Sequence, residues 1–379
     1  MSPLTIGVLH SSLKENEHRV PLHPDHFRAV HDSVREQLIF EKGYGRAFGI
    51  SDEAISGFFG GVSDREQILQ ESGVVLLPKP MPDDLRQLRE GGILWGWPHC
   101  VQQGEITQVA IDRKLTLIAW EAMFTWKGNS RQMHLFYRNN EMAGYCAVAH
   151  ALACAGLDGN YGPPLRATVL SLGSVSRGAV FALQGHGIRD IHIYTQRPPW
   201  TLHDQVLGCV YHRMQRQGNL AFDSNPTGSP IPLSEVFNQS DVIVNGILQD
   251  TESPLMYMLP GQESHLKPGS LIVDVSCDEG MGFPFAKPTS FEDPCFSVGP
   301  GTYYAVDHTP SYMWRSASWE ISRALLPFLK TVSDGPEAWK KEKTISEAVE
   351  IQNGIIQNEK ILSFQGRLAE YPHNLAEKV

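Results

Sequence analysis

The chain has 379 residues, a length that usually divides into two domains, and 41% hydrophobic with 20% charged residues is the composition of a folded globular protein. Its formal net charge of −10 argues against a general nucleic-acid surface, which needs clustered lysine and arginine. No apolar run reaches the roughly 20 residues of a membrane helix, and the N-terminus lacks the pattern of a secretion signal.

The six cysteines lie far apart and form no CxxC pair. This spacing predicts reduced, mostly buried thiols rather than a disulfide framework or a metal site. We therefore expect a cytoplasmic protein that holds no metal and binds neither nucleic acid nor membranes.

Short apolar runs alternate with helix-like segments along most of the chain. In the N-terminal third we expect strands at 4–9, 74–78, 93–97 and 115–120, and an amphipathic helix at 24–38. Four nearly continuous apolar runs, typical of strands buried on both faces, follow at 167–172, 191–195, 241–246 and 270–276. Beyond Pro310 the pattern predicts helices at 319–332 and 346–361.

This alternation predicts the α/β class, with two Rossmann-like domains and a cleft between them. The N-terminal substrate domain takes residues 1–138 and is completed by C-terminal helices within 309–379. The central domain, which we expect to bind the dinucleotide, takes residues 139–308.

The segment ATVLSLGSVSRG (167–178) has the outline of a dinucleotide-binding turn between a strand and a helix. Glycines in such a turn allow a tight bend, close approach to the pyrophosphate and close helix packing. Gly173 and Gly178 are present, whereas Ser171 stands where the first glycine is usual. We expect Ser171 to replace that glycine by keeping a negative φ. A purely structural glycine turn is the alternative.

The end of the next strand decides the cofactor. An acidic residue there would bind the ribose hydroxyls of NAD and repel a 2′-phosphate. The strand ends instead in Thr195, Gln196 and Arg197, and an arginine can pair with a phosphate through two hydrogen bonds. The sequence therefore favours NADP(H), although a solvated surface arginine is the alternative.

Three side chains of the first domain follow predicted strands. Arg19 follows the first strand, Lys79 ends LLPKP, and His99 ends WGWPHC. An arginine can bind a substrate carboxylate, and a neighbouring lysine and histidine can polarise a carbonyl and transfer protons. A surface lysine or a core histidine is the alternative for each residue taken alone. Trp95 and Trp97 share one face of their strand and are either a pocket wall or core.

Several segments, NEHRVPL, LLPKP, WGWPHC, NEMAGY and VDVSCDEG, resemble the alanine dehydrogenase family, which also includes saccharopine dehydrogenase and the transhydrogenase nucleotide domain. Within it, the segments are most similar to the N5-(carboxyethyl)ornithine synthase branch, including the stretch TPSYMWRSASWE (309–320). The likeness covers roughly residues 5–330.

The resemblance implies roles for particular residues. Arg19 would bind the carboxylate of a keto acid, Lys79 its carbonyl oxygen, and His99 would transfer protons. Asp278 would reach toward the nicotinamide and the reacting nitrogen, and Glu121 would support the substrate. Trp97 is expected at the substrate only because of its position beside His99. The positions expected to bind the cofactor are Ser171, Gly173, Ser174, Val175, Gly178, Thr195, Gln196, Arg197, Asn245, Gly246 and His308. His308 departs from the asparagine common in the family.

The function implied is an NADPH-dependent reductive condensation, in which the amine of an amino acid such as ornithine or lysine joins a keto acid such as pyruvate through an imine. An alanine dehydrogenase or saccharopine dehydrogenase type of reaction is the first alternative. A non-catalytic NADP(H)-binding protein is the second. We expect small-molecule substrates and a homo-oligomer.

Overall fold

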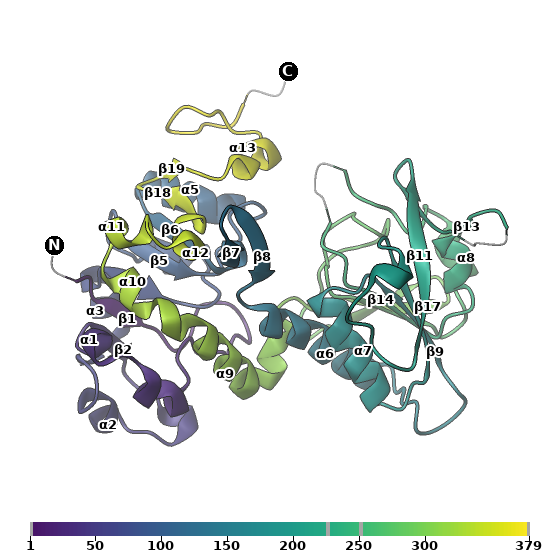
Figure 1. The fold of residues 1–379 in the computed structure, drawn as a ribbon, viewed down its shortest axis with the longest axis horizontal. Helices are drawn as coiled ribbons and strands as arrows, with labels where there is room; N and C mark the ends of the chain where they lie inside the picture. Colours follow the sequence, from purple (N-terminus) through teal and green to yellow (C-terminus); the bar gives the residue numbers. More distant parts are fainter. Residues whose placement is uncertain (1–2, 225–227, 250–252, 377–379) are drawn as a thin grey trace. The chain divides into compact units, whose positions relative to one another are not determined.

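The computed structural model describes residues 3–224, 228–249 and 253–376. By internal packing the chain divides into two compact units (Figure 1). Unit 1 comprises Met1–Tyr137 and Trp314–Val379, and unit 2 comprises Arg138–Met313. The expected α/β class with two Rossmann-like units is confirmed, because each unit is built around a mainly parallel sheet.

Unit 1 contains a sheet in the order β19-β18-β6-β5-β4-β1-β2-β3. Its strands are β1 (Ile6–Val8), β2 (Leu38–Glu41), β3 (Gly61–Ser63), β4 (Val74–Leu76), β5 (Ile93–Gly96), β6 (Thr116–Ala119), β18 (Val349–Gln352) and β19 (Ile355–Ile356). The strands from β6 to β3 are parallel, and β18 joins β6 antiparallel. A separate hairpin is formed by β7 (Phe124–Lys127) and β8 (Ser130–His134).

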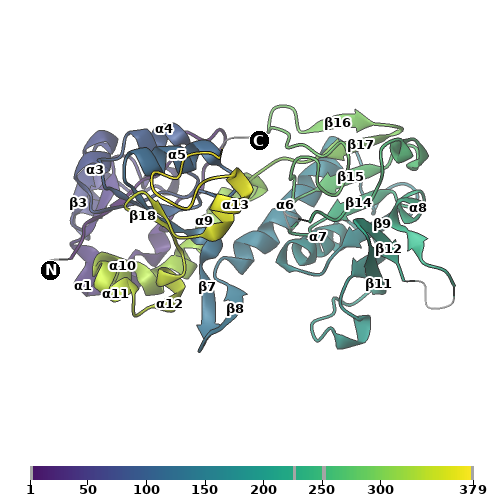
Figure 2. The same ribbon diagram turned by 90° about the horizontal axis from the view of Figure 1, so that it is seen from above.

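Helices cover both faces of this sheet (Figure 2). One face packs against α9 (Trp314–Leu325), α10 (Leu329–Ser333), α11 (Pro336–Trp339) and α12 (Lys343–Ser346). The other packs against α3 (Arg65–Glu71), α4 (Pro82–Arg86), α5 (Gly104–Asp112) and α13 (Glu359–Gln365). The short helices α1 (Asp32–Arg35) and α2 (Asp52–Ser56) complete the unit. Burial on both faces explains why the strands are nearly continuous apolar runs.

Two sequence predictions in unit 1 were wrong. The helix expected at 24–38 is broken: a 3₁₀ helix (Pro24–Ala29) ends at the extended residue Val30, and His31 caps α1. The helix expected at 346–361 is the β18–β19 hairpin followed by α13. Asn353 and Gly354 both have positive φ, as a type I′ turn requires, and Asn-Gly is a strong hairpin signal. The C-terminal segment therefore adds strands as well as helices to the sheet.

Unit 2 contains a sheet in the order β13-β12-β11-β10-β9-β14-β15-β17-β16. Its strands are β9 (Arg166–Leu170), β10 (Asp190–Thr195), β11 (Cys209–Gln217), β12 (Leu220–Asp223), β13 (Ile231–Pro232), β14 (Val242–Asn245), β15 (Leu271–Asp274), β16 (Cys295–Val298) and β17 (Gly301–Tyr304). The strands from β11 to β17 are parallel, with antiparallel β12 and β13 at one edge and β16 at the other.

One face of this second sheet packs against α6 (Tyr137–Cys154) and α7 (Ser174–Gly185), and the other face, which is also apolar, packs against α8 (Leu233–Phe237). The two long helices approach closely through glycines. A Cβ on Gly178 would overlap the backbone carbonyl oxygen of Glu141, and one on Gly144 would overlap that of Val175. The partner in the close packing at Gly178 is therefore the helix α6.

The cysteines are all free, but only Cys100 and Cys146 are buried, so the expectation that most would be buried was wrong. Within the described residues, no helix is both long enough and apolar enough to span a membrane.

Candidate functional site

The side chains predicted to carry chemistry in unit 1 follow four neighbouring strands. Arg19 lies in the segment after β1, Lys79 follows β4, His99 follows β5, and Glu121 follows β6. The chain builds the sheet outward from β1 in one direction and from β4 in the other, so the order reverses between these two strands. Ligands of parallel α/β sheets bind at the carboxyl edge beside such a reversal.

The segments after β4 and β5 are joined by their backbones. Leu77 N–H donates to Trp95 O at 3.2 Å, and Trp97 N–H donates to Pro78 O at 2.8 Å. A Cβ on Gly96 would overlap the carbonyl oxygen of Leu77, so the close approach requires glycine. These contacts hold the ends of β4 and β5 together, and Lys79 and His99 follow these two ends.

His99 has a left-handed backbone, with φ of 49°. Such a conformation costs about 1 kcal/mol or more for a residue with a side chain and is found mainly where surrounding contacts enforce it. The enforcing contact is with Glu121, whose Oε1 accepts the His99 N–H at 2.5 Å and lies 3.9 Å from Nδ1 of the imidazole. The backbone strain and the contact together fix the position of the imidazole.

Glu121 is the centre of this group. Desolvation and the neighbouring Glu350 carboxyl raise its pKa well above the ordinary value, while Lys79 acts in the opposite direction. Glu350, in β18, is buried, and desolvation raises its pKa as well. Within the described residues, Oε2 of Glu121 and Oε2 of Glu350 have no hydrogen-bond partner. Two close carboxyls favour holding a proton between them, next to the histidine.

Arg19 is buried beside Glu17. Its Nε donates to Glu17 Oε1 at 2.8 Å, and its Nη2 pairs with Glu17 Oε2. The guanidinium also lies 5.1 Å from the ring centre of Trp97, which packs against Trp120 and Phe136. Trp97 is only 6% exposed and, like Trp95, belongs to the hydrophobic core. The pairing of Arg19 with a carboxylate of the chain itself was not expected from the sequence pattern.

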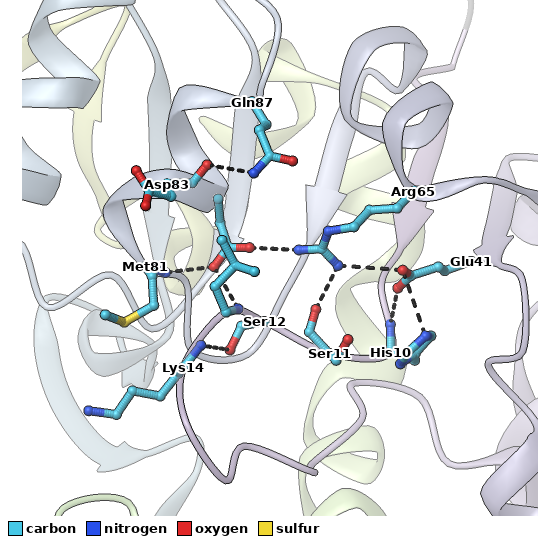
Figure 3. A network of polar contacts seen from close by, with 11 residues as sticks. His10, Ser11, Ser12, Lys14, Glu41, Arg65, Met81, Asp83 and Gln87 are labelled. Carbon is cyan, nitrogen blue, oxygen red and sulfur yellow. Dashed lines mark hydrogen bonds and ion pairs between the residues drawn. The ribbon is translucent and has the colours of Figure 1, made fainter.

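A polar network anchors the segment that leads from β1 toward Arg19 (Figure 3). Arg65, at the start of α3, donates to Ser11 O at 2.8 Å and pairs with the buried Asp84 of α4 at 2.6 Å. Glu41, at the end of β2, accepts the N–H of His10 at 2.9 Å. The loop therefore starts from a fixed point, held by charged groups from three neighbouring elements.

In unit 2 the turn after β9 differs from its prediction in one respect. Ser171 has φ of 75°, so the expectation of a negative φ was wrong. The bend still requires the left-handed backbone that glycine would adopt without strain. Ser171 N–H donates to Tyr194 O at 2.7 Å, which ties the bend to β10.

The start of α7 suits a phosphate. Gly173 is the N-cap and supplies no side-chain hydrogen bond to the first turn. A Cβ on Gly173 would have only Ser171 Oγ, at 3.9 Å, within 4 Å, so the space in front of the helix is open. Ser174 and Val175 form the first turn, whose N–H groups and dipole favour an anion. The residues present therefore fit the pyrophosphate of a dinucleotide.

Next to this turn lies a cavity of about 360 Å³. It is lined by Ser171, Thr195, Gln196, Arg197, Met214, Arg216, Ile247, Leu248, Gln249, Ser253 and Leu255. The cavity spans the ends of β9 and β14, where the strand order of the second sheet reverses. Arg197 reaches back to the turn and donates to Leu172 O at 3.5 Å. Sequence reasoning missed Arg216, because β11 was not predicted as a strand.

Asn245 and Asp274 end neighbouring strands in register. Asn245 Nδ2 donates to Asp274 Oδ1 at 2.9 Å, so this predicted cofactor residue is buried and committed to a contact within the protein. Asp274 also accepts the Cys277 N–H at 3.1 Å and the Tyr303 hydroxyl at 2.9 Å. These bonds fix the loop that carries Asp278, whose pKa is raised by burial.

The two remaining predicted cofactor positions have packing roles in the structure. A Cβ on Gly246 would overlap Ser176 Oγ, so glycine lets the end of β14 approach α7. His308 has φ of 47°, and its buried ring packs on Phe291 at 4.8 Å between centres, with Nδ1 3.5 Å from Asp307 Oδ2. Unit 1 thus brings Lys79, His99 and Glu121 together, and unit 2 brings the glycine turn after β9 together with Arg197.

Two sequence models of one family match the chain. The alanine dehydrogenase/PNT N-terminal domain matches residues 7–143, and the corresponding C-terminal domain matches residues 229–359. The chain belongs to the alanine dehydrogenase/PNT family. Residues 144–228, which hold the glycine turn and both cavity arginines, lie between the two matched regions.

The chain is similar to curated members of this family over most of its length. It is 26% identical to N(5)-(carboxyethyl)ornithine synthase of Clostridium botulinum, covering 82% of this chain and 89% of that protein. It is also 26% identical to alanine dehydrogenase of Halomonas elongata, covering 87% of each. A solved L-alanine dehydrogenase superposes with a TM-score of 0.74 at 19% identity over 95% of this chain, a likeness of fold. The chain is an oxidoreductase of this family, which binds a nicotinamide dinucleotide.

Proposed function

We propose that this chain catalyses the NADPH-dependent condensation of an α-keto acid with the amine of an amino acid, giving a secondary amine. The observation that carries the proposal is the group of Lys79, His99 and Glu121 at the carboxyl edge of the unit 1 sheet. The likeness to N(5)-(carboxyethyl)ornithine synthases of two genera supports an amino acid as the amine.

The chemistry requires addition, loss of water and reduction. The amine nitrogen bonds to the keto carbon, the carbonyl oxygen leaves as water, and the resulting iminium ion takes up two electrons and one proton, the equivalent of a hydride, to give the secondary amine. When bound, the nicotinamide supplies those electrons as a hydride. Lys79 polarises the carbonyl, and His99 carries protons to the departing oxygen. Asp278 stabilises the positive charge of the iminium nitrogen.

Arg19 is the proposed carboxylate-binding residue. A guanidinium is planar and has five N–H donors, and the bidentate pair with Glu17 orients it on the face of Trp97. The Glu17 carboxylate also compensates the buried positive charge of Arg19.

The choice of NADPH over NADH rests on the β10 strand end. The strand ends in Thr195, Gln196 and Arg197, so none of the three positions carries the acid that would repel a 2′-phosphate. The bound cofactor would extend from the Gly173 turn toward the cavity lined by Arg197.

The test is a panel of amines (ammonia, ornithine, lysine) with pyruvate and with 2-oxoglutarate, following NADPH consumption and product mass. An ornithine or lysine adduct with pyruvate supports the proposal. Lys79→Ala and His99→Ala should abolish turnover and leave NADPH binding within about twofold. Turnover that persists in each of the two variants would show that these residues take no part in the chemistry.

An alanine dehydrogenase type of reaction is the second candidate, favoured by the likeness to the Halomonas enzyme. In that case ammonia with pyruvate gives the fastest turnover and alanine is the product. A lysine adduct with 2-oxoglutarate would indicate the saccharopine type. Tight NADPH binding without turnover of any of these pairs would refute the proposed substrates.

A further inference from the structure

Arg216 owes its position to the length of β11. Strands β10 and β11 are parallel, with Thr195 opposite Arg213, and β10 ends there while β11 continues to Gln217. Arg216 therefore lies three residues beyond the tip of β10, past the edge at which parallel strands bind ligands. Side chains alternate along a strand, so Met214 and Arg216 share a face, and both line the cavity.

The guanidinium of Arg216 is held in place by neutral groups. Its Nε donates to Gly218 O at 2.6 Å, Nη2 to Ser253 Oγ at 2.6 Å, and Nη1 to Ser253 O at 3.2 Å. Carbonyl and hydroxyl oxygens orient the group without neutralising its charge. Within the described residues, no carboxylate forms an ion pair with it.

The cavity therefore combines two arginines from neighbouring strands. Arg197 follows β10 and Arg216 comes from the extension of β11, and none of the described lining residues is acidic. Two like charges at one small cavity repel each other, and an anion between them removes that cost. A planar guanidinium is well suited to a phosphate, because it presents paired donors.

We propose that Arg216 and Arg197 together bind the 2′-phosphate of the adenosine ribose, so that the β11 extension sets the preference for the phosphorylated cofactor. This inference rests on the proposed use of NADPH and names a second residue for it. The two guanidiniums would approach the phosphate from different strands, which positions it more strictly than one surface arginine.

The test measures binding of two adenosine fragments by calorimetry to the full chain. The fragments are 2′,5′-ADP, which carries the 2′-phosphate, and 5′-AMP, which lacks it. The variant is Arg216→Gln. The control is Arg213→Gln, on the same strand but the opposite face, exposed and outside the cavity lining.

We expect Arg216→Gln to weaken the binding of 2′,5′-ADP by roughly tenfold to a hundredfold, and the binding of 5′-AMP by less than about threefold. Arg213→Gln should change neither. The loss for 2′,5′-ADP should also shrink as salt is added, because a charge pair is screened. Thermal unfolding of both variants near that of wild type shows that the fold persists.

Two results overturn the inference. An equal loss of affinity for both fragments in Arg216→Gln would mean that Arg216 only shapes the cavity. No loss of affinity would mean that it does not contact the phosphate. In both cases, a wild-type preference for 2′,5′-ADP leaves the proposed cofactor intact. A wild type that binds the two fragments equally would instead refute the use of NADPH, and this inference with it.

Discussion

The carboxyl of Asp274 provides a quantitative test of the unit 2 site. It is 1% exposed, and desolvation raises its pKa from an ordinary 3.8 to about 6. Hydrogen bonds from the Cys277 N–H, the Tyr303 hydroxyl and Asn245 act in the opposite direction, and the nearby Asp278 adds to the rise. The folded chain therefore keeps this proton at a pH where the unfolded chain has lost it.

The sign of the effect on stability follows from the higher pKa of Asp274 in the folded chain. The contribution of the bound proton is complete below about pH 4 and is lost as the pH rises to about 6. About two pH units at about 1.4 kcal/mol each give about 3 kcal/mol. Between pH 4 and pH 7 the free energy of unfolding of the wild type should fall by this amount relative to that of Asp274→Asn, because the amide does not titrate.

The assay is urea unfolding of both proteins across this pH range, followed by circular dichroism. Asn can accept fewer hydrogen bonds than Asp, so the variant carries a constant offset in its free energy of unfolding. Only the pH dependence of the difference is diagnostic. Parallel curves for the two proteins from pH 4 to pH 7 would refute a raised pKa at Asp274.

Three further substitutions test the glycine turn, the helix contact and the carboxylate site. Gly178→Ala should destabilise the chain by about 3 kcal/mol or more in chemical unfolding, because its Cβ would overlap a backbone carbonyl of α6. Ser171→Gly should stabilise it by about 1 kcal/mol, because glycine adopts φ of 75° without strain. Arg19→Lys should raise the keto-acid KM about tenfold or more with little change in NADPH affinity, because lysine cannot form a bidentate pair with the carboxylate of the substrate.

Each of these substitutions has a control or a contrary result. Gly185→Ala, in the same helix with open space around its Cβ, should stabilise by about 0.5–1 kcal/mol. If it destabilises as much as Gly178→Ala, the helix contact is not the cause. Ser174→Gly, inside the first turn of α7, should destabilise, and similar values for both serines would argue against strain at Ser171. An unchanged KM in Arg19→Lys would place the carboxylate elsewhere.

Local patterns in the sequence were enough to predict the alternating architecture and the order of the site residues along the chain. Strands buried on both faces are continuous apolar runs, so β4, β5, β6, β10, β14 and β15 were found within a residue or two. Lys79 and His99 could be placed at adjacent strand ends, because consecutive parallel strands usually neighbour each other. The same reasoning is wrong at 346–361, where the apolar spacing suits a helix but the Asn-Gly turn makes a hairpin.

Tertiary structure decided what the local pattern leaves open. Glu350 reaches Glu121 because β18 pairs with β6 across more than 200 residues of chain, and Arg216 reaches the cavity because β11 is longer than β10. Ser171 adopts a positive φ because the bend and its bond to β10 impose it. The sequence by itself determined which residue types stand at strand ends. Packing and strand pairing determined which of them meet, since such contacts depend on the whole fold and leave no periodic signal.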